Sequence, residues 1–109
     1  MTTYEREYMG TKAVTKTKPQ PNFDLKEPMM YKVIYINDDV TTLQFVIETL
    51  MKVFGHNLED ATIITEKIHV DGSGVAAVLP YEIAEQKGTE ATNASRNQGF
   101  PLQLKVEEE

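Results

Sequence analysis

The residues of this chain that could do chemistry are the consecutive polar side chains Asn37, Asp38 and Asp39 and two histidines, His56 and His69. A catalytic interpretation pairs a carboxylate of this run with His69 as acid and base, because side chains at a strand end and a helix end can converge. The spacing does not require that pairing. The sequence has no Gly-rich phosphate loop, no His-Glu-x-x-His, no Gly-x-Ser-x-Gly and no EF-hand loop. No motif therefore indicates an enzyme.

The same residue types also have a purely structural interpretation. Asn and Asp favour turns and helix caps, and the hydroxyls of Thr41 and Thr42 can cap a helix that begins after them. Taken alone, the run at 37–39 favours a turn followed by a helix cap. We expect His56 to face solvent in a loop. His69 falls at a predicted helix end, where the helix dipole favours a cation.

Composition limits the classes of function. A chain of 109 residues allows one domain with a modest core. Its 40% hydrophobic and 26% charged residues are typical of a soluble globular protein. The absence of cysteine excludes disulfides, thiolate-bound metals and thiol catalysis. The sequence has no apolar run of about 18 residues and no apolar signal region at its N-terminus. We expect a cytoplasmic protein without a cofactor, a metal or a membrane span.

The net charge of −6 is unevenly distributed. Residues 1–30 carry five basic and four acidic side chains, whereas residues 31–109 carry six basic and thirteen acidic ones. The first segment is therefore +1 and the remainder −7. Binding to nucleic-acid phosphates needs clustered Lys and Arg. An acidic body argues against that binding, so protein partners are favoured over nucleic acid.

The elements that would position the polar residues follow from hydrophobic periodicity. Residues 1–27 are polar and aperiodic, which predicts a disordered arm before a folded domain at 28–109. The β-branched and aromatic run 30–36 predicts a strand covered on both faces. Apolar residues at three- and four-residue steps then predict a helix that Gly55 ends. They are Leu43, Val46, Ile47, Leu50, Met51 and Phe54.

A second helix is predicted from about Leu58 to His69, stopped by the segment 71–74. Its expected inward-facing residues are Leu58, Ala61, Ile64, Thr65 and Ile68. The run 75–79 predicts a buried strand that Pro80 ends. Alternation of Leu102, Leu104 and Val106 with polar residues predicts a last strand with one covered face.

A third helix, from Tyr81 to about Asn97, has the weakest periodicity, and Gly88 in its middle costs about 1 kcal/mol relative to Ala. Its expected inward side consists of Ile83, Ala84, Lys87, Ala91 and Ala94. The resulting order β-α-α-β-α-β predicts an α+β fold, a two-layer sandwich of three helices packed on a three-stranded sheet.

Four segments, taken in order, resemble the ClpS family of protease adaptors. The longest is 31–46, which contains the strand, the Asn-Asp-Asp turn and the helix start. The others are 59–62, 68–72 and 81–87, with Pro101 and Leu102 closing the pattern. The resemblance covers about residues 28–107. It implies the predicted sandwich and a monomeric, non-enzymatic adaptor. Such an adaptor binds N-terminal Leu, Phe, Tyr or Trp and delivers the substrate to a Clp AAA+ unfoldase such as ClpA.

The resemblance also implies roles for individual positions. Asn37, Asp38 and His69 would contact the α-amino group of the substrate, and Asp39 and Thr41 would shape the mouth of the site. The side-chain pocket would be lined by Leu43, Val46, Thr65, Ile68 and Leu102. Glu82 and Lys87, about one helical turn apart, would dock on the N-terminal domain of the unfoldase, and the arm would enter its pore. Without the resemblance, this pair is simply a solvated helix face.

Two positions depart from the family pattern, because Leu43 and Thr65 stand where relatives usually have Met. Leu43 occupies the gate that disfavours Ile and Val in the family, and the smaller Thr65 is expected to enlarge the pocket for a bulkier aromatic. Two alternatives remain open at this point. One is a metal or acid–base enzyme built on Asp38, Asp39 and His69. The other is a structural domain similar to those of ribosomal stalk proteins.

Overall fold

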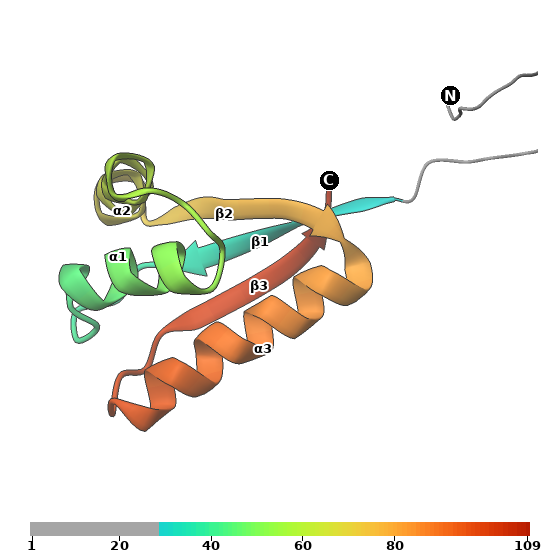
Figure 1. Cartoon of the computed structure of the whole chain (residues 1–109). Helices are drawn as coiled ribbons and strands as arrows, with labels where there is room; N and C mark the ends of the chain where they lie inside the picture. Colours follow the sequence, from blue (N-terminus) through green and yellow to red (C-terminus); the bar gives the residue numbers. More distant parts are fainter. Residues whose placement is uncertain (1–28) are drawn as a thin grey trace, which may run out of the picture.

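The computed structural model describes residues 29–109. Its elements are β1 (Met30–Ile36), α1 (Leu43–Lys52), α2 (Leu58–Asp71), β2 (Ser73–Pro80), α3 (Tyr81–Asn97) and β3 (Gln103–Glu108). The predicted order and the sandwich of three helices and a three-stranded sheet are confirmed (Figure 1). The predicted arm at 1–27 lies outside the described residues. Within 29–109, no helix is both long and apolar enough to span a membrane.

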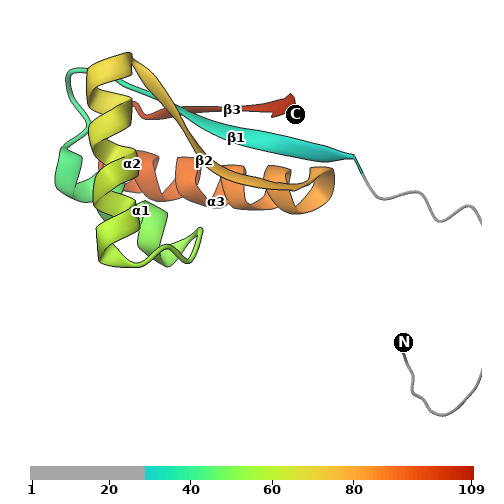
Figure 2. The same ribbon diagram turned by 90° about the horizontal axis from the view of Figure 1, so that it is seen from above.

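The first strand lies in the centre of the sheet, in the order β2-β1-β3, and both pairings are antiparallel. The side chains of Val33 and Tyr35 are fully buried, whereas Lys32, Ile34 and Ile36 between and beyond them are half-buried. One face of the sheet is therefore closed by helices and the other is only partly covered. Figure 2 shows α3 lying along the sheet, with α1 and α2 grouped at one end of it.

The second strand differs from its prediction. It is longer than expected and lies at an edge of the sheet, so that Val75 and Val78 are exposed rather than buried. The register between β1 and β2 shifts between Val33 and Ile34, which places Ala76 as an extra residue in β2. Ala76 is buried against the helices. The prediction of a wholly buried strand is wrong because helices cover only one of its faces.

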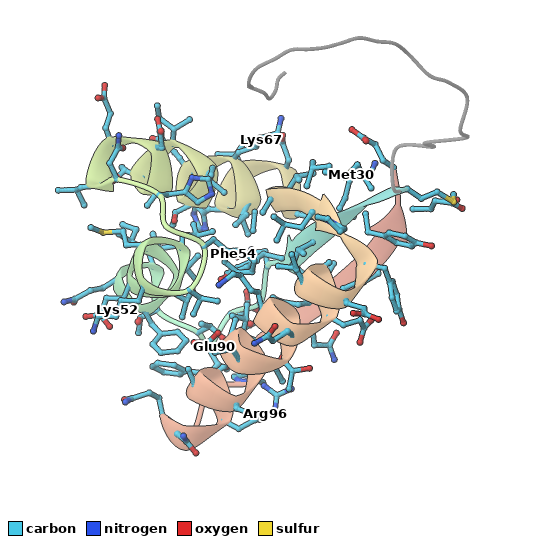
Figure 3. The ribbon with its side chains drawn as sticks, turned by 45° about the vertical axis from the view of Figure 1, so that its right-hand side comes forward. Met30, Lys52, Phe54, Lys67, Glu90 and Arg96 are labelled. Carbon is cyan, nitrogen blue, oxygen red and sulfur yellow. The ribbon has the colours of Figure 1, made fainter. Side chains whose placement is uncertain are left out.

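The core lies between the sheet and the pair α1–α2. Its buried members are Tyr35, Val46, Leu50, Ala61, Ile68, Ala76 and Leu102. The phenol of Tyr35 hydrogen-bonds the hydroxyl of Thr49 at 2.7 Å, and burial, which outweighs that bond, raises the pKa of Tyr35 to about 12. Phe54 points into this interior, whereas Lys52 and Lys67 point outward (Figure 3). The ring of Phe54 packs edge-on against Tyr35, with centroids 6.0 Å apart.

Side-chain caps fix where the first two helices begin. The hydroxyl of Thr42 accepts a hydrogen bond from Phe45 N at 3.1 Å, and Asn57 Oδ1 accepts one from Asp60 N at 2.8 Å. His56 precedes the second cap. The prediction that it faces solvent is wrong. It is half-buried, and its Nε2 lies 2.6 Å from the carbonyl oxygen of Ala76. This bond joins the loop between the helices to the irregular part of β2.

The helix faces differ from the predicted ones at several positions. In α3 the buried residues are Ala84, Gly88, Ala91 and Ser95, whereas Ile83 is 41% exposed. Gly88 faces β3, where a side-chain Cβ would lie 3.8 Å from Val106 Cγ2. At the start of α2, Leu58 is 60% exposed. The weak periodicity of α3 did not determine which of its faces is buried, and Leu58, as the first residue of α2, lies at the edge of the apolar pattern of that helix.

Candidate functional site

A hollow of about 340 Å³ lies where β1 ends and the chain turns into α1. Figure 1 shows this turn at the end of the sheet where α1 and α2 gather. It is lined by Asn37, Asp38, Asp39, Val40, Thr41, Thr42, Leu43 and His69. The structure thus brings together six predicted site residues. They are Asn37, Asp38, Asp39, Thr41, Leu43 and His69.

One backbone hydrogen bond joins the two sides of this hollow. Asn37 N donates to the carbonyl oxygen of Gly72 at 2.9 Å, and Gly72 N donates to that of Ile68 at 2.9 Å. Gly72 ends α2 in the left-handed conformation, with a φ of 91°, which favours glycine because it has no Cβ. The end of β1 is therefore fixed to the end of α2. His69, which is exposed in the last turn of that helix, lies beside the polar turn for this reason.

Asp38 organises the turn with both of its carboxylate oxygens. Oδ1 accepts hydrogen bonds from Val40 N at 2.8 Å and Thr41 N at 2.7 Å, and Oδ2 accepts one from Thr41 Oγ1 at 2.7 Å. The predicted structural role in a turn is thus present, although the cap of α1 is Thr42. A carboxylate offers about four acceptor positions. Because three are occupied by this turn and the residues from 29 to 109 supply no fourth donor, Oδ2 keeps one position within this part of the chain that can face the hollow.

The environment of Asp38 keeps its carboxylate ionised. Burial raises its pKa, but the hydrogen bonds from Thr41 and Val40, together with the positive charge of Arg96, lower the pKa below its usual value overall. The backbone N–H of Val40 and the guanidinium of Arg96 are parts of the site that sequence reasoning missed. The position of Arg96 in the last turn of α3 is the only signal the sequence offered, and it does not indicate proximity to residue 38.

Arg96 also fixes the segment that leads into β3. Its Nη1 donates to the carbonyl oxygens of Phe100 at 3.0 Å and Leu102 at 2.9 Å. Leu102, one of the predicted pocket residues, is fully buried in the core cluster. One guanidinium therefore holds the backbone of a pocket candidate and contributes to the charge balance at Asp38. This double role of Arg96 depends on contacts between distant parts of the chain.

We call the residues that line the hollow its rim. The residues predicted to form the side-chain pocket lie partly at this rim and partly in the interior. Leu43 lies at the rim and is 47% exposed. The other four predicted residues are buried and are not among the residues that line the hollow. They are Val46, Thr65, Ile68 and Leu102. Their role around a substrate side chain stays a prediction.

The predicted docking pair lies on α3 but does not share one face of it. Glu82 and Lys87 are five residues apart, so at 3.6 residues per turn they are separated by roughly 140° around the helix axis. Glu82 is exposed and Lys87 is half-buried. The description of the pair as one turn apart is therefore wrong, because a shared face requires a separation of three or four residues. Docking by either residue stays a prediction.

Within residues 29–109 no three His, Asp or Glu side chains form a group that could hold a metal ion. The arrangement at the hollow is instead a set of acceptors for an external hydrogen-bond donor. Asp38 supplies a stable negative charge, and Asn37 and His69 supply further polar atoms beside it. Leu43 adds an apolar edge. Together the fold and the hollow define a small α+β domain whose site is suited to binding.

Comparison with known proteins identifies the family. A family model described as ATP-dependent Clp protease adaptor protein ClpS matches residues 26–105. The chain belongs to the ClpS family. It is accordingly a Clp protease adaptor and not an enzyme, and the alternatives of an acid–base enzyme and of a stalk-like structural domain are both set aside.

Several relatives agree with this assignment over most of their length. A ClpS adapter protein of Campylobacter jejuni is 49% identical over 94 residues, which are 86% of this chain and 98% of the relative. The ClpS 1 adapter protein of Rhizobium meliloti is 40% identical over 98 residues, which are 90% of this chain and 80% of the relative. The solved structure of Agrobacterium tumefaciens ClpS2 bound to L-phenylalaninamide is similar, with a TM-score of 0.73 and 37% identity. That similarity covers 76% of this chain and all of the other.

Proposed function

We propose that this chain binds the free α-amino group and the bulky apolar side chain of N-degron substrates and delivers them to a Clp AAA+ unfoldase. The observation that carries the proposal is the state of Asp38. Its carboxylate is held by three hydrogen bonds, its pKa is lowered, and one acceptor position on Oδ2 is left over in a hollow shared with Asn37 and His69. Such an arrangement suits a compact cation with several hydrogen-bond donors.

A substrate N-terminus is a cation of this kind. Its amine has a pKa of about 7.7–8.0, so at neutral pH it is mostly an ammonium group with three donors. Asp38 Oδ2 and Asn37 Oδ1 would each accept one of them. His69 would accept the third as a neutral imidazole or would donate to the first peptide carbonyl instead. Hydrogen bonds to charged groups contribute about 1.5–3 kcal/mol, and an internal residue has only one N–H to offer. Selectivity for chain ends follows from this difference in donors.

Asp39 and Thr41 would shape the mouth of the site. Asp39 is exposed at the hollow, and Thr41 is half-buried and holds Asp38 through both its N–H and its hydroxyl. In this proposal Thr41 acts on the substrate through Asp38, because it fixes the orientation of the carboxylate. Asp39 adds a second negative charge at the entrance, which favours the approach of a cation.

The apolar part of the site would receive the first side chain of the substrate. Leu43 would form the gate, with the buried residues Val46, Thr65, Ile68 and Leu102 beneath it. Burying a Leu or Phe side chain contributes about 1.5–3 kcal/mol. The Agrobacterium tumefaciens structure supports this arrangement, because its ligand, L-phenylalaninamide, combines a free amine with an aromatic side chain.

The size of Thr65 bears on which side chain is preferred. Because Thr is smaller than the Met that relatives usually carry there, we expect the pocket to accept bulky aromatic residues well. Titration with peptides that begin with Leu, Phe, Tyr or Trp would measure this preference. Tightest binding for Leu, with Trp much weaker, would contradict it.

Delivery would use a surface away from the hollow. We propose that the exposed Glu82 and the half-buried Lys87 on α3 contact the N-terminal domain of ClpA or a related unfoldase, and that residues 1–27 enter its pore. The family assignment supports a Clp partner. Because the two side chains point in different directions around α3, each would contact a different part of that partner, and single substitutions should weaken docking independently.

Fluorescence anisotropy would test the amine-binding proposal. The peptides differ only in whether residue one is free or N-acetylated, and the proteins are the wild type, Asp38→Ala and the control Glu66→Gln. Glu66 is exposed on α2 and does not line the hollow. We expect acetylation, and separately Asp38→Ala, to weaken binding at least about tenfold, since 1.4 kcal/mol corresponds to that factor. Equal affinity for the free and the acetylated peptide would contradict the proposal.

A further inference from the structure

The hydroxyl of Thr65 differs from the other buried hydroxyls of the protein. The buried polar residues of the described part of the chain are Thr49, Thr65 and Ser95. Thr49 Oγ1 lies 2.7 Å from the phenol oxygen of Tyr35, and Ser95 Oγ donates to the carbonyl oxygen of Phe100 at 3.0 Å. Thr65 is only 3% exposed, yet among residues 29–109 its Oγ1 has no hydrogen-bond partner. It is the exception among buried groups that are otherwise paired.

The unpaired state of Thr65 is not forced by its helix. A threonine in a helix can donate to the carbonyl of the residue four positions earlier, and Thr62 Oγ1 does so to Leu58 O at 2.7 Å on the same helix. Thr65 makes no such bond. A buried hydroxyl without a partner is destabilising, and valine would fill the same volume without that cost. A hydroxyl at this position is therefore better explained by a partner that arrives from outside the chain.

The position of Thr65 indicates where such a partner would come from. Thr65 lies four residues before His69 on the same face of α2, so it is about one helical turn, roughly 6 Å along the helix axis, further from the hollow. On α1, Val46 is likewise about one turn beyond the rim residue Leu43. The two helices pack against each other, with α1 running away from the hollow and α2 running toward it. Thr65 and Val46 thus form the level beneath the rim.

We infer that the hydroxyl of Thr65 is the hydrogen-bond partner of a tyrosine phenol, so that this chain prefers N-terminal Tyr to Phe. The inference rests on the proposed function. With the amine held at Asp38 and the side chain directed between α1 and α2, the para position of the ring points to the level one turn below the rim. A phenol O–H there can donate to or accept from Thr65 Oγ1. Phe has the same ring without that group, and it leaves Thr65 unpaired.

The comparison of Tyr with Phe isolates this contact, because the two peptides present the same amine and nearly the same apolar surface. We expect wild type to bind the Tyr peptide about tenfold more tightly than the Phe peptide, a factor that corresponds to 1.4 kcal/mol. In Thr65→Val the ratio should fall to about one, through weaker Tyr binding with little change for Phe. Thr65→Ser, which keeps the hydroxyl, should retain most of the preference.

Thr49→Val is the matched control, because it removes a buried hydroxyl that already has partners and does not line the hollow. It should lower the stability of the fold and leave the Tyr-to-Phe ratio unchanged. Anisotropy titrations of the full chain with the two peptides, each free and N-acetylated, measure all of these quantities. The wild-type ratio is informative even if a variant does not fold.

The outcomes separate this inference from the proposed function. If free peptides bind better than acetylated ones but wild type binds Tyr no better than Phe, or the ratio persists in Thr65→Val, the role of Thr65 is wrong and the amine site stands. If acetylation has no effect, the amine site is wrong. A Tyr preference lost only in Thr65→Val would still support the hydroxyl contact in that case. Absence of binding to all of the peptides would overturn both.

Discussion

The rim of the hollow and the layer beneath it are built in different ways. At the rim, the polar groups of residues 37–42 are exposed or half-buried, and short hydrogen bonds from Val40 and Thr41 fix the carboxylate of Asp38. Beneath it, Val46, Ile68 and Leu102 belong to the hydrophobic core, and Thr65 is buried without a hydrogen-bond partner in the described part of the chain. In the proposed function, a rim fixed by its own hydrogen bonds would be preorganised for one group, the ammonium. Selectivity among side chains would then depend on packing in the layer beneath.

The largest expected effect is on the free energy of unfolding, for a substitution in the layer beneath the rim. Leu102→Ala should reduce the free energy of unfolding by about 2–5 kcal/mol, because a fully buried Leu is replaced and a cavity is left. Urea unfolding followed by circular dichroism would measure it. A loss below about 1 kcal/mol would show that Leu102 is not part of the core, and the contrast between the two layers would then fail.

The affinity for a free N-terminus should depend on pH through the ligand rather than through Asp38. Above about pH 8 the amine loses its proton, so affinity should fall by about tenfold per unit. The pKa of Asp38 is lowered, so its carboxylate stays charged down to pH 5 and does not limit binding there. The lowered pKa of Asp38 also contributes to the free energy of unfolding. This contribution is complete above the unfolded pKa of about 3.9 and is lost as the pH falls through the lower folded pKa.

Anisotropy titrations at intervals between pH 5 and 10, with free and acetylated peptides, would check this dependence. The alkaline loss should be confined to the free peptide. If the acetylated peptide loses affinity over the same range, a group on the protein is titrating. The rim residues would then not recognise the charge of the amine.

Substitution of Thr42, a rim residue other than Asp38, should have a smaller effect on stability than Leu102→Ala. Thr42→Ala removes the cap of α1, whose hydroxyl accepts from Phe45 N, and should cost about 1 kcal/mol of unfolding free energy. The same urea titration would measure it. A cost as large as that of Leu102→Ala would mean that the rim carries part of the stability of the core.

The smallest expected change lies away from both layers and is stabilising. Gly88→Ala in α3 should raise the free energy of unfolding by about 0.5–1 kcal/mol, because a new Cβ would meet Val106 Cγ2 at an ordinary contact distance of 3.8 Å. Peptide binding should not change. A destabilised variant would show that α3 lies closer to β3 than the structure indicates.

Local sequence was sufficient for most of the fold. All six elements were predicted, because the apolar patterns of five of them are clear and are bounded by signals such as Gly55, the segment 71–74 and Pro80, whereas α3 has only a weak periodicity. The gathering of Asn37, Asp38 and His69 at one hollow also agrees with the expectation based on the family resemblance.

The features that the sequence did not predict depend on contacts between distant segments of the chain. The bond from His56 to Ala76 O requires the irregular register of β2, and the influence of Arg96 on Asp38 requires that the end of α3 lie near the end of β1. The missing partner of Thr65 is known only when every neighbour is in place. Periodicity indicates that a residue faces inward, but it does not indicate which atoms it meets there.

The central claim is that Asp38 recognises the charged amine, and a thermodynamic cycle tests it most directly. Affinities would be measured for free and acetylated peptides with wild type and with Asp38→Asn, which keeps the shape of the side chain while removing its charge. We expect acetylation to weaken binding to wild type by at least about tenfold and to weaken binding to Asp38→Asn by a clearly smaller factor, since the interaction with Asp38 is already lost and only those with Asn37 and His69 remain. If both proteins lose the same factor on acetylation, the amine is recognised without Asp38, and the claim is wrong.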